Sequence, residues 1–417
     1  MGKGPRTDLS SPADAAREGT SPRKQNTIIV GAGIAGLACA RRLHDANRPF
    51  LIISERVGGR IHQSGDGAVN LGAYYVRADY TNVNRHVDLG RRIDRLSVQR
   101  HDAGDTYGFW NGRLLLHLPQ AVRFLRLLIR FRRHYDHLKQ RCSIAGQAAA
   151  IRSDPWLEQL YHQPAPDFVD QHRLGELARW YLAPGLHGTV FASLQDITAF
   201  ALLLGALPVL IPAHEFTLRL DRLADGFAGT IVADTVNRIS AQRAGYRVET
   251  LASGTFIADQ VVIATPTDAA KKLLGLSAGK QPVAAHMFQV AGPLRDPYDQ
   301  ADFHLFAEDD ATLAIAQQAD GSVLFCSRQD HPDFGLYFKA WRVMDHKHWN
   351  PAFNLIGDDI LECEQGPNLF LIGDHNIVGL EDAYLTGLFA ANQIIARTRA
   401  PEPAPTGRPM VASKQPA

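Results

Sequence analysis

The stretch of residues 26–60, NTIIVGAGIAGLACARRLHDANRPFLIISERVGGR, decides the fold. It begins with a β-branched run at residues 27–30, followed by Gly31, Gly33 and Gly36 at G-x-G-x-x-G spacing. An apolar helical pattern and a second buried run at residues 49–54 come next, and Glu55 ends that run. Strand, glycine turn, helix, strand and acid within about thirty residues are typical of a βαβ nucleotide-binding unit in an α/β protein.

Each residue type in this unit has a physical reason. Gly31 allows a tight turn, Gly33 lets a pyrophosphate approach the backbone, and Gly36 lets the helix pack close to the strand. Residues 34–35 open the helix, whose free N–H groups and partial positive charge suit phosphate. Glu55 accepts hydrogen bonds from a ribose diol and repels a 2′-phosphate. The unit alone does not separate NAD from FAD.

The residues after Glu55 make that distinction. Arg56 is compatible with NADP as the cofactor, but Gly58, Gly59 and Arg60 follow it. This arrangement resembles the second glycine motif of the flavin-dependent amine oxidase and carotenoid (phytoene) desaturase superfamily. The resemblance implies a backbone that passes beside the FAD pyrophosphate, with the arginine near phosphate and flavin. The spacer after Glu55 is shorter than is usual in the family.

Three further segments resemble the same family in the same order. Residues 70–76 are similar to the loop beneath the flavin, residues 259–266 to a returning strand, and residues 369–374 to a strand that ends in Gly-Asp. A helix is expected from about Glu381, with its N-terminus at the pyrimidine edge of the flavin. The residues that we assign to FAD are Gly31, Gly33, Ile34, Ala35, Gly36, Glu55, Arg56, Gly58, Gly59, Arg60, Gly72, Ala73, Ile231, Ala264, Thr265, Gly373, Asp374, Asp382 and Ala383.

The resemblance also implies how the chain is divided. A discontinuous, Rossmann-type FAD-binding domain is expected at residues 26–77, 221–277 and 346–398. An inserted α+β substrate-binding domain is expected at residues 78–220 and 278–345. The polar and Pro-rich composition of residues 1–25 and 399–417 predicts disorder.

Few catalytic residues are expected, because the flavin carries the hydride chemistry. The family often places a lysine that holds water near flavin N5, and His286 stands near that position here. Trp349 and Tyr75 are the candidates for aromatic residues beside the flavin. A lone histidine that enters a strand is more often structural, and aromatic residues at such positions are as often core.

Composition limits the partners. The net charge of +1 gives no reason to expect nucleic acid, and the four scattered cysteines form no metal-binding motif, so no metal is assigned.

The apolar residues 200–213 contain Pro208 and are too short to span a bilayer, so a buried helix is expected. An apolar or aromatic small molecule would suit a pocket beside it, and a cytoplasmic location is expected.

An arginine-rich helix at residues 124–138 raises the question of membrane contact. Its pattern places one apolar group near one face and arginines near another: Val122, Leu125, Leu128 and Ile129, against Arg123, Arg126, Arg130 and Arg133. An ordinary solvated face is favoured over contact with an anionic bilayer.

The sequence predicts an FAD-dependent oxidoreductase that removes hydride from a C–N or C–C bond of a small organic substrate, as an amine oxidase or a desaturase does. A flavin-dependent isomerase without net oxidation and a non-catalytic flavin-binding partner protein stay open. An NAD(P)-dependent dehydrogenase would explain residues 27–55, but it leaves Gly58–Arg60 and Gly373-Asp374 unexplained.

Overall fold

The computed structural model describes residues 22–94, 97–102, 104–277, 281–357 and 359–399. The predictions of disorder therefore fall mostly outside the described residues. Strand β1 (Arg23–Ala32) corrects one boundary, since residues 23–25 were expected to be disordered but pair in parallel with Phe256, Ile257 and Ala258 of β11. The backbone ladder extends this strand although the side chains of Arg23 and Lys24 are exposed.

The glycine turn and its flanking elements form as predicted. Helix α1 (Ile34–Asp45) follows β1, and β2 (Phe50–Val57) pairs with β1 in parallel. Strand β2 runs two residues past Glu55, across an irregularity that shifts the register to Ala32 and Val57. Glu55 therefore lies within the strand and not at its end.

These strands belong to an eight-stranded sheet with a parallel core in the order β18-β11-β1-β2-β8. Its remaining strands, β17, β10 and β9, are antiparallel to their partners. The bounds are β8 (Ile231–Val232), β9 (Val236–Ala241), β10 (Tyr246–Thr250), β11 (Thr255–Ile263), β17 (Glu364–Gly366) and β18 (Leu369–Leu371). Residues from three distant parts of the chain thus share one sheet.

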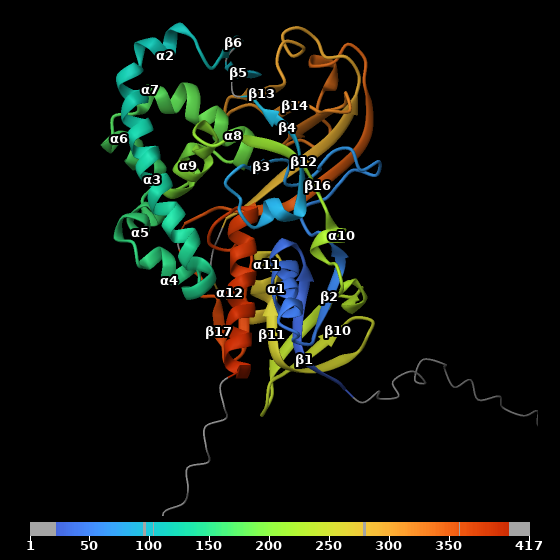
Figure 1. Ribbon diagram of the computed structural model, residues 1–417. Coiled ribbons are helices and arrows are strands. Elements are labelled where there is room, and N and C mark those ends of the chain that lie inside the picture. The colour runs from blue at the N-terminus through green and yellow to red at the C-terminus, as the bar shows by residue number, and fades with distance from the viewer. Residues whose placement is uncertain (1–21, 95–96, 103, 278–280, 358, 400–417) are drawn as a thin grey trace, which may run out of the picture.

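Helices α1 and α12 (Leu380–Arg399) pack together on one face of this sheet (Figure 1). Their contact is very close, because a Cβ on Gly387 of α12 would lie 2.3 Å from the carbonyl oxygen of Ala35 in α1. The opposite face is covered by β9, β10 and α11 (Thr267–Leu274), with Val248 and Phe256 buried there. The two helix N-termini therefore lie at the same edge of the sheet.

The rest of the chain forms a helical group beside a second, seven-stranded sheet (Figure 1). The helices are α2 (Gly112–Leu116), α3 (Leu118–Ala145), α4 (Gln147–Arg152), α5 (Pro155–His162), α6 (Ala165–Gln171), α7 (Gly175–Leu177), α8 (Ala183–Val190) and α9 (Ala199–Gly205). Short α10 (Leu220–Leu223) packs against α1 in the other half. The sheet strands are β5 (Val98–Asp102), β6 (Asp105–Gly108), β12 (Pro282–Ala291), β13 (Phe303–Phe306), β14 (Thr312–Gln317), β15 (Val323–Ser327) and β16 (Arg342–Asn354). A small third sheet contains β3 (Val76–Arg77), β4 (Val87–Ile93) and β7 (Ala213–Leu218).

Strand pairing shows which segments of the chain belong to each of the two large sheets. The strands of the first sheet fall in the segments expected for the FAD-binding domain, apart from residues 23–25. Strand β16 pairs with β12 as far as Asn354, so residues 346–354 belong to the second sheet and not to the first. This strand brings Trp349 from the second sheet to the boundary between the two halves.

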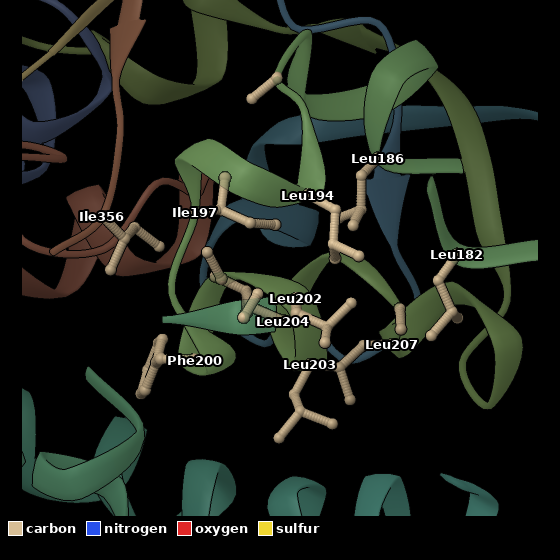
Figure 2. Packing of buried hydrophobic residues seen from close by; sticks show 14 of the residues in the cluster. Leu182, Leu186, Leu194, Ile197, Phe200, Leu202, Leu203, Leu204, Leu207 and Ile356 are labelled. Carbon is tan, nitrogen blue, oxygen red and sulfur yellow. The ribbon is translucent and has the colours of Figure 1, made fainter. Parts of the chain in front are cut away.

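The apolar residues 200–213 form a buried helix and a proline-containing turn. Helix α9 is followed by a 3-10 turn at Leu207–Val209 that contains Pro208. Phe200, Leu202 and Leu203 are fully buried in the core of the helical group, which Figure 2 shows from close by. No helix within the described ranges is long and apolar enough to cross a membrane.

The long helix α3 presents a different face to the core than its sequence pattern suggests. Of the four apolar residues expected on one face, Leu128 is buried, but Val122, Leu125 and Ile129 are about 40% exposed. The buried residues lie on another side of the helix, and half of them are aromatic: Phe124, Leu128, Phe131, Tyr135, Leu138 and Cys142. The aromatic rings fill the core, and smaller apolar residues remain in solvent.

The crossing of α1 and α12 yields a prediction about stability. The substitution Gly387→Ala places a methyl group against Ala35 and Cys39, so the helices must move apart. We expect the free energy of unfolding in urea to fall by about 1–3 kcal/mol. Gly185→Ala in α8, where a Cβ has nothing within 4 Å, is the matched control and should be neutral or stabilising by up to about 1 kcal/mol. Equal urea midpoints for the two variants would contradict this account.

Candidate functional site

A cavity of about 900 Å³ extends from the glycine turns of the first sheet into the inserted half. Its size lies at the upper end of the range for ligand pockets. The predicted residues that line it are Gly31, Gly33, Ile34, Ala35, Glu55, Arg56, Gly58, Gly59, Arg60, Gly72, Ala73, Tyr75, Ala264, Thr265, Trp349, Gly373, Asp374 and Ala383. Four segments that are distant in sequence thus meet around one space.

The two glycine motifs pack directly against each other. A Cβ on Gly59 would lie 2.9 Å from the Cα of Gly33, and Gly59 has a positive φ of 60°. Gly31 has a φ of 107°, and a Cβ there would lie 2.7 Å from the carbonyl oxygen of Ala264. A side chain at any of these positions would separate the loops or fill the space between them. The backbone itself therefore forms this wall of the cavity.

The same wall offers hydrogen-bond donors that lack protein partners. Gly33 is the N-cap of α1 and provides no side chain to cap the first N–H groups of the helix, which begins at Ile34 on the cavity lining. The buried hydroxyl of Thr265 has no hydrogen-bond partner. Free N–H groups at a helix N-terminus together with an unpartnered hydroxyl suit a phosphate-containing ligand. A pyrophosphate of FAD therefore fits the residues present.

The acid after the second strand has a partner that sequence patterns do not reveal. Glu55 accepts a hydrogen bond of 2.8 Å from the hydroxyl of Thr235. Thr235 and Asp234 follow β8 and line the cavity, and Asp234 accepts hydrogen bonds from the backbone of Ala252 and Ser253. Burial acts to raise the pKa of Asp234, but hydrogen bonds from Ser253, Thr250 and Thr235 outweigh it and hold the pKa below its usual value. No glycine or helical signal marks this loop in the sequence.

Arg60 and Asp374 form an ion pair across the cavity wall. Nη2 of Arg60 lies 2.5 Å from Oδ1 of Asp374, and Nη1 donates to the carbonyl oxygen of Ala352. Burial alone would raise the pKa of Asp374, but the Arg60 guanidinium holds it below its ordinary value. Two residues that the sequence assigns to different parts of the cofactor therefore contact each other, and they join the second glycine motif to the C-terminal Gly-Asp turn.

The loop at residues 70–76 is held against the segment after Arg60. A Cβ on Gly72 would lie 2.0 Å from the carbonyl oxygen of Arg60, so only glycine fits there. The indole N–H of Trp349 donates to the carbonyl oxygen of Leu71 at 2.5 Å, which fixes the ring beside this loop. Trp349 is thus positioned on the cavity wall by the loop expected to pass beneath the flavin.

Two cations lie against the ring of Trp349. The guanidinium carbon of Arg56 and the ammonium of Lys347 are each 5.1 Å from its ring centroid. Both cations line the cavity, and sequence reasoning missed Lys347. Burial, followed by the charges of Lys347 and Arg56, lowers the pKa of nearby His62.

The neighbouring tyrosines have different surroundings. Tyr74 donates a hydrogen bond to the carbonyl oxygen of Gly188 and packs against the core of the helical group. Tyr75 lines the same cavity with its ring 5.2 Å from that of Tyr74 in a T-shaped contact. Burial raises the pKa of both phenols, so they stay neutral. Tyr75 remains a candidate for substrate contact.

The position of His286 is contrary to its predicted catalytic place. His286 lies on β12, where side chains alternate between the two faces of the sheet. Its neighbour Met287 lines the cavity, as does Lys347, which pairs with Met287 across β12 and β16. His286 is not part of the lining, and its ring stacks on that of His348, a residue that the lining does include. The cationic group that β12 and β16 present to the cavity is therefore Lys347 on the adjacent strand.

Three residues assigned to the cofactor also lie outside the lining. Gly36 is packed behind it, since a Cβ there would lie 2.0 Å from the carbonyl oxygen of Gly31. Ile231 belongs to β8, and the loop after that strand reaches the cavity in its place. Asp382 is buried beneath Gly379 and Leu380, which do line the cavity. Gly36 acts through packing, and the other two are behind the wall.

Asp382 is the titratable group with the most unusual surroundings near the cavity. Oδ2 accepts a hydrogen bond of 2.6 Å from the hydroxyl of Tyr135, and Oδ1 has no hydrogen-bond partner. Burial raises the pKa of Asp382 to about 6, although the Tyr135 hydrogen bond and the charges of Arg77 and Lys139 oppose it.

This environment predicts how stability depends on pH. An ordinary carboxyl has a pKa of about 3.9, so protonated Asp382 favours the folded state. Its contribution is present at low pH and is lost as the pH rises through about 6. The stability of Asp382→Asn relative to the wild type should therefore increase between pH 4 and pH 7 in thermal or urea unfolding. Asp167→Asn, an exposed aspartate in the first turn of α6, is the control. A pH-independent difference for Asp382→Asn would contradict the prediction.

Comparisons with known proteins agree with this site. The sequence matches the family described as flavin containing amine oxidoreductase over residues 34–289. Comparison with the curated proteins found no match.

Solved structures share the fold at low sequence identity. A putrescine oxidase bound to putrescine has 14% identity and a TM-score of 0.64, with 90% of this chain and 100% of that chain covered. For cyclohexylamine oxidase from Brevibacterium oxydans the values are 15% and 0.61, with 89% and 98% covered. An oxidoreductase from Methanosarcina mazei has 14% identity and a TM-score of 0.62, with 89% and 100% covered. The family match, together with a glycine cradle suited to FAD, shows that the chain belongs to the flavin-containing amine oxidoreductase family and is an FAD-dependent oxidoreductase.

Proposed function

We propose that this protein oxidises a neutral amine that carries an apolar or aromatic group, by hydride transfer from its C–N bond to FAD. The observation that carries the proposal is the distribution of charge and apolar surface along one cavity. The FAD that the family implies would be held by the glycine turns, the α1 N-terminus, Glu55 and the Arg60–Asp374 pair. When bound, it supplies the hydride acceptor.

The far end of the cavity is apolar. The residues that line it there come from α9, the segment before it and the end of β16: Phe191, Ile197, Ala201, Leu204, Phe353, Leu355 and Ile356. Tyr74, Tyr75 and Trp349 line the same cavity. An alkyl or aromatic group would be stabilised there by removal from water, at about 25 cal/mol per Å² of apolar area.

Charges on the lining favour a neutral nitrogen. The acidic lining residues are Glu55, Asp234 and Asp374, and all three belong to the part expected to hold FAD. Arg77 is paired with Asp79, while Lys347 forms no ion pair within the described residues. A substrate ammonium would face the positive charge of Lys347 with no carboxylate to hold it. Only a neutral amine has the lone pair that assists loss of hydride, so Lys347 would favour the reactive form.

The ligands of the structural neighbours agree with an amine, since one was solved with putrescine and another is a cyclohexylamine oxidase. Putrescine carries two amines and needs acidic partners, which the apolar end of this cavity lacks in its described lining. We therefore propose that the substrate resembles a monoamine with an apolar ring or chain more than it resembles a diamine.

The test is anaerobic flavin reduction by a panel of monoamines, diamines and apolar alkenes, followed by peroxide release in air. Bleaching by monoamines with apolar groups is expected. Bleaching by an alkene alone would favour a desaturase. Conversion without net oxygen or acceptor consumption would favour an isomerase, and no bleaching by any class would favour a non-catalytic role.

The substitution Lys347→Met tests the charge argument. The flavin reduction rate should rise with pH as the bound amine loses its proton. Because removing the like charge should raise the pKa of the bound amine, this rise should occur at higher pH in Lys347→Met than in the wild type. Lys339→Met, an exposed lysine paired with Asp299, is the control and should leave the profile in place. Identical pH profiles for wild type and Lys347→Met would remove Lys347 from the proposal.

A further inference from the structure

Three metal-ligating side chains converge on the face of the second sheet that is opposite Met287. Nδ1 of His286 lies 3.1 Å from Nε2 of His346 and 3.3 Å from Oδ1 of Asp330. Nε2 of His346 lies 3.8 Å from the same carboxylate oxygen. Two imidazole nitrogens and one carboxylate oxygen thus surround one point, away from the cavity described above.

Two of these separations, 3.1 and 3.3 Å, match ligands that share one ion, and the third, 3.8 Å, corresponds to a wider angle at the ion. Atoms bound at about 2.0–2.2 Å are about 3.0 Å apart at octahedral right angles and about 3.4 Å apart at tetrahedral angles. The triangle formed by the three atoms has a centre about 2.0 Å from each corner, within the range of Zn–N and Zn–O bonds.

The three ligands are supported by adjacent strands. The sheet order is β16-β12-β15, with His346 on β16 and His286 on the central strand. Asp330 follows β15, whose last residue Ser327 pairs with His286. Sheet hydrogen bonds therefore set the spacing of the ligands.

Both imidazole rings are held in orientation by stacking. His348 lies parallel to His286 with centroids 4.1 Å apart, and Phe288 lies parallel to His346 at 4.2 Å. Such packing pre-organises ligands before an ion arrives. The side chain of His286 is 11% exposed and that of Asp330 is 58% exposed, so an ion can enter from solvent and keep water ligands.

We propose that His286, His346 and Asp330 bind a first-row divalent transition-metal ion such as Zn²⁺. Imidazole with one carboxylate suits these ions, whereas Ca²⁺ and Mg²⁺ favour oxygen ligands. Sequence spacing predicts no metal here because the ligands come from three separate segments. Bound metal would tie the segment after β15 to the strands that present Met287 and Lys347 to the cavity.

The alternative without metal is a hydrogen bond between the two histidines beside a shared carboxylate. Equilibrium dialysis of the chelator-treated, flavin-containing protein against Zn²⁺ distinguishes the two. One Zn²⁺ per chain is expected for the wild type, with binding weakened at least tenfold in His346→Gln and in Asp330→Asn and lost in the double variant. His137→Gln, an exposed histidine on α3, should bind as the wild type does.

A thermal shift provides the second readout. Zn²⁺ should raise the unfolding midpoint of the wild type and of His137→Gln, but not that of the double variant, because only the native site binds the ion. Equal midpoints without Zn²⁺ establish that the variants fold. The proposal is overturned if the wild type binds no stoichiometric Zn²⁺, or if the double variant binds it as tightly.

A second observation concerns the outer face of α2 and α3. Large apolar side chains are exposed along it, over a stretch without acidic residues from 106 to 135: Trp110, Leu115, Leu116, Leu118, Val122, Leu125 and Ile129. Exposed fractions reach 70% for Trp110 and 78% for Leu116. On α3, the apolar positions 118, 122, 125 and 129 follow helical spacing, and exposed Arg126 and Arg133 lie next to them.

We infer that this face docks on an anionic membrane surface. Helices α2 and α3 lie on the outer side of the helical group (Figure 1). Basic residues beside an exposed apolar stripe are complementary to acidic headgroups and the acyl boundary. Arg126 and Arg133 form no ion pair within the described part of the chain, so their charge is available. The solvated-face interpretation explains the arginines, but it does not explain the exposed Trp110, Leu115 and Leu116.

Vesicle co-sedimentation tests this surface. The protein should pellet with vesicles that contain phosphatidylglycerol and much less with pure phosphatidylcholine. Trp110→Ser with Leu116→Ser, and Arg126→Gln with Arg133→Gln, should each reduce the bound fraction at least fivefold. Leu336→Ser, an exposed leucine elsewhere, is the control. Absence of pelleting, equal pelleting of the variants, or a concentration-dependent dimer that these variants abolish would overturn the inference.

Discussion

The close approach of Gly33 and Gly59 is the constraint on which the cavity depends. Each glycine belongs to a different turn, and the gap between the two turns is too small for a side chain. The second turn can reach this position because β2 shifts its register against β1 and ends at Val57. The Arg60 side chain then reaches Asp374, more than three hundred residues away in sequence. One backbone contact and one ion pair thus join the beginning of the chain to its end around the ligand space.

Much of the first sheet could be predicted because its signals are local. Glycine spacing, β-branched runs and the acid after β2 each reflect short-range geometry. The family resemblance then related segments that no periodicity could connect. What the sequence did not reveal is the loop after β8, where Asp234 and Thr235 act through backbone hydrogen bonds and a hydroxyl contact with Glu55. Such contacts depend on which strands become neighbours, and no residue pattern encodes that pairing.

The substrate side of the cavity shows a second limit of prediction from sequence. In a strand, a shift of one residue moves a side chain to the opposite face of the sheet. His286 stands in the expected segment, but Met287 is the residue that faces the cavity, and the cation comes from Lys347 on the paired strand. Similarly, on α3 the apolar pattern indicates a helix correctly, but aromatic rings and not Val122, Leu125 and Ile129 occupy the core. Periodicity predicts the element, while size and packing decide which of its faces is buried.

Strands β12 and β16 therefore support two kinds of chemistry on opposite faces. Toward the cavity they present Met287, Lys347 and Trp349, and toward the other side they present His286 and His346. Because the faces alternate along the same backbone, an ion held by the histidines would restrain the positions of Lys347 and Trp349 without contacting the ligand space. The stacking of His348 on His286 already orders this part of the sheet. The positions of Lys347 and Trp349 at the cavity wall thus depend on the same two strands that carry the histidines.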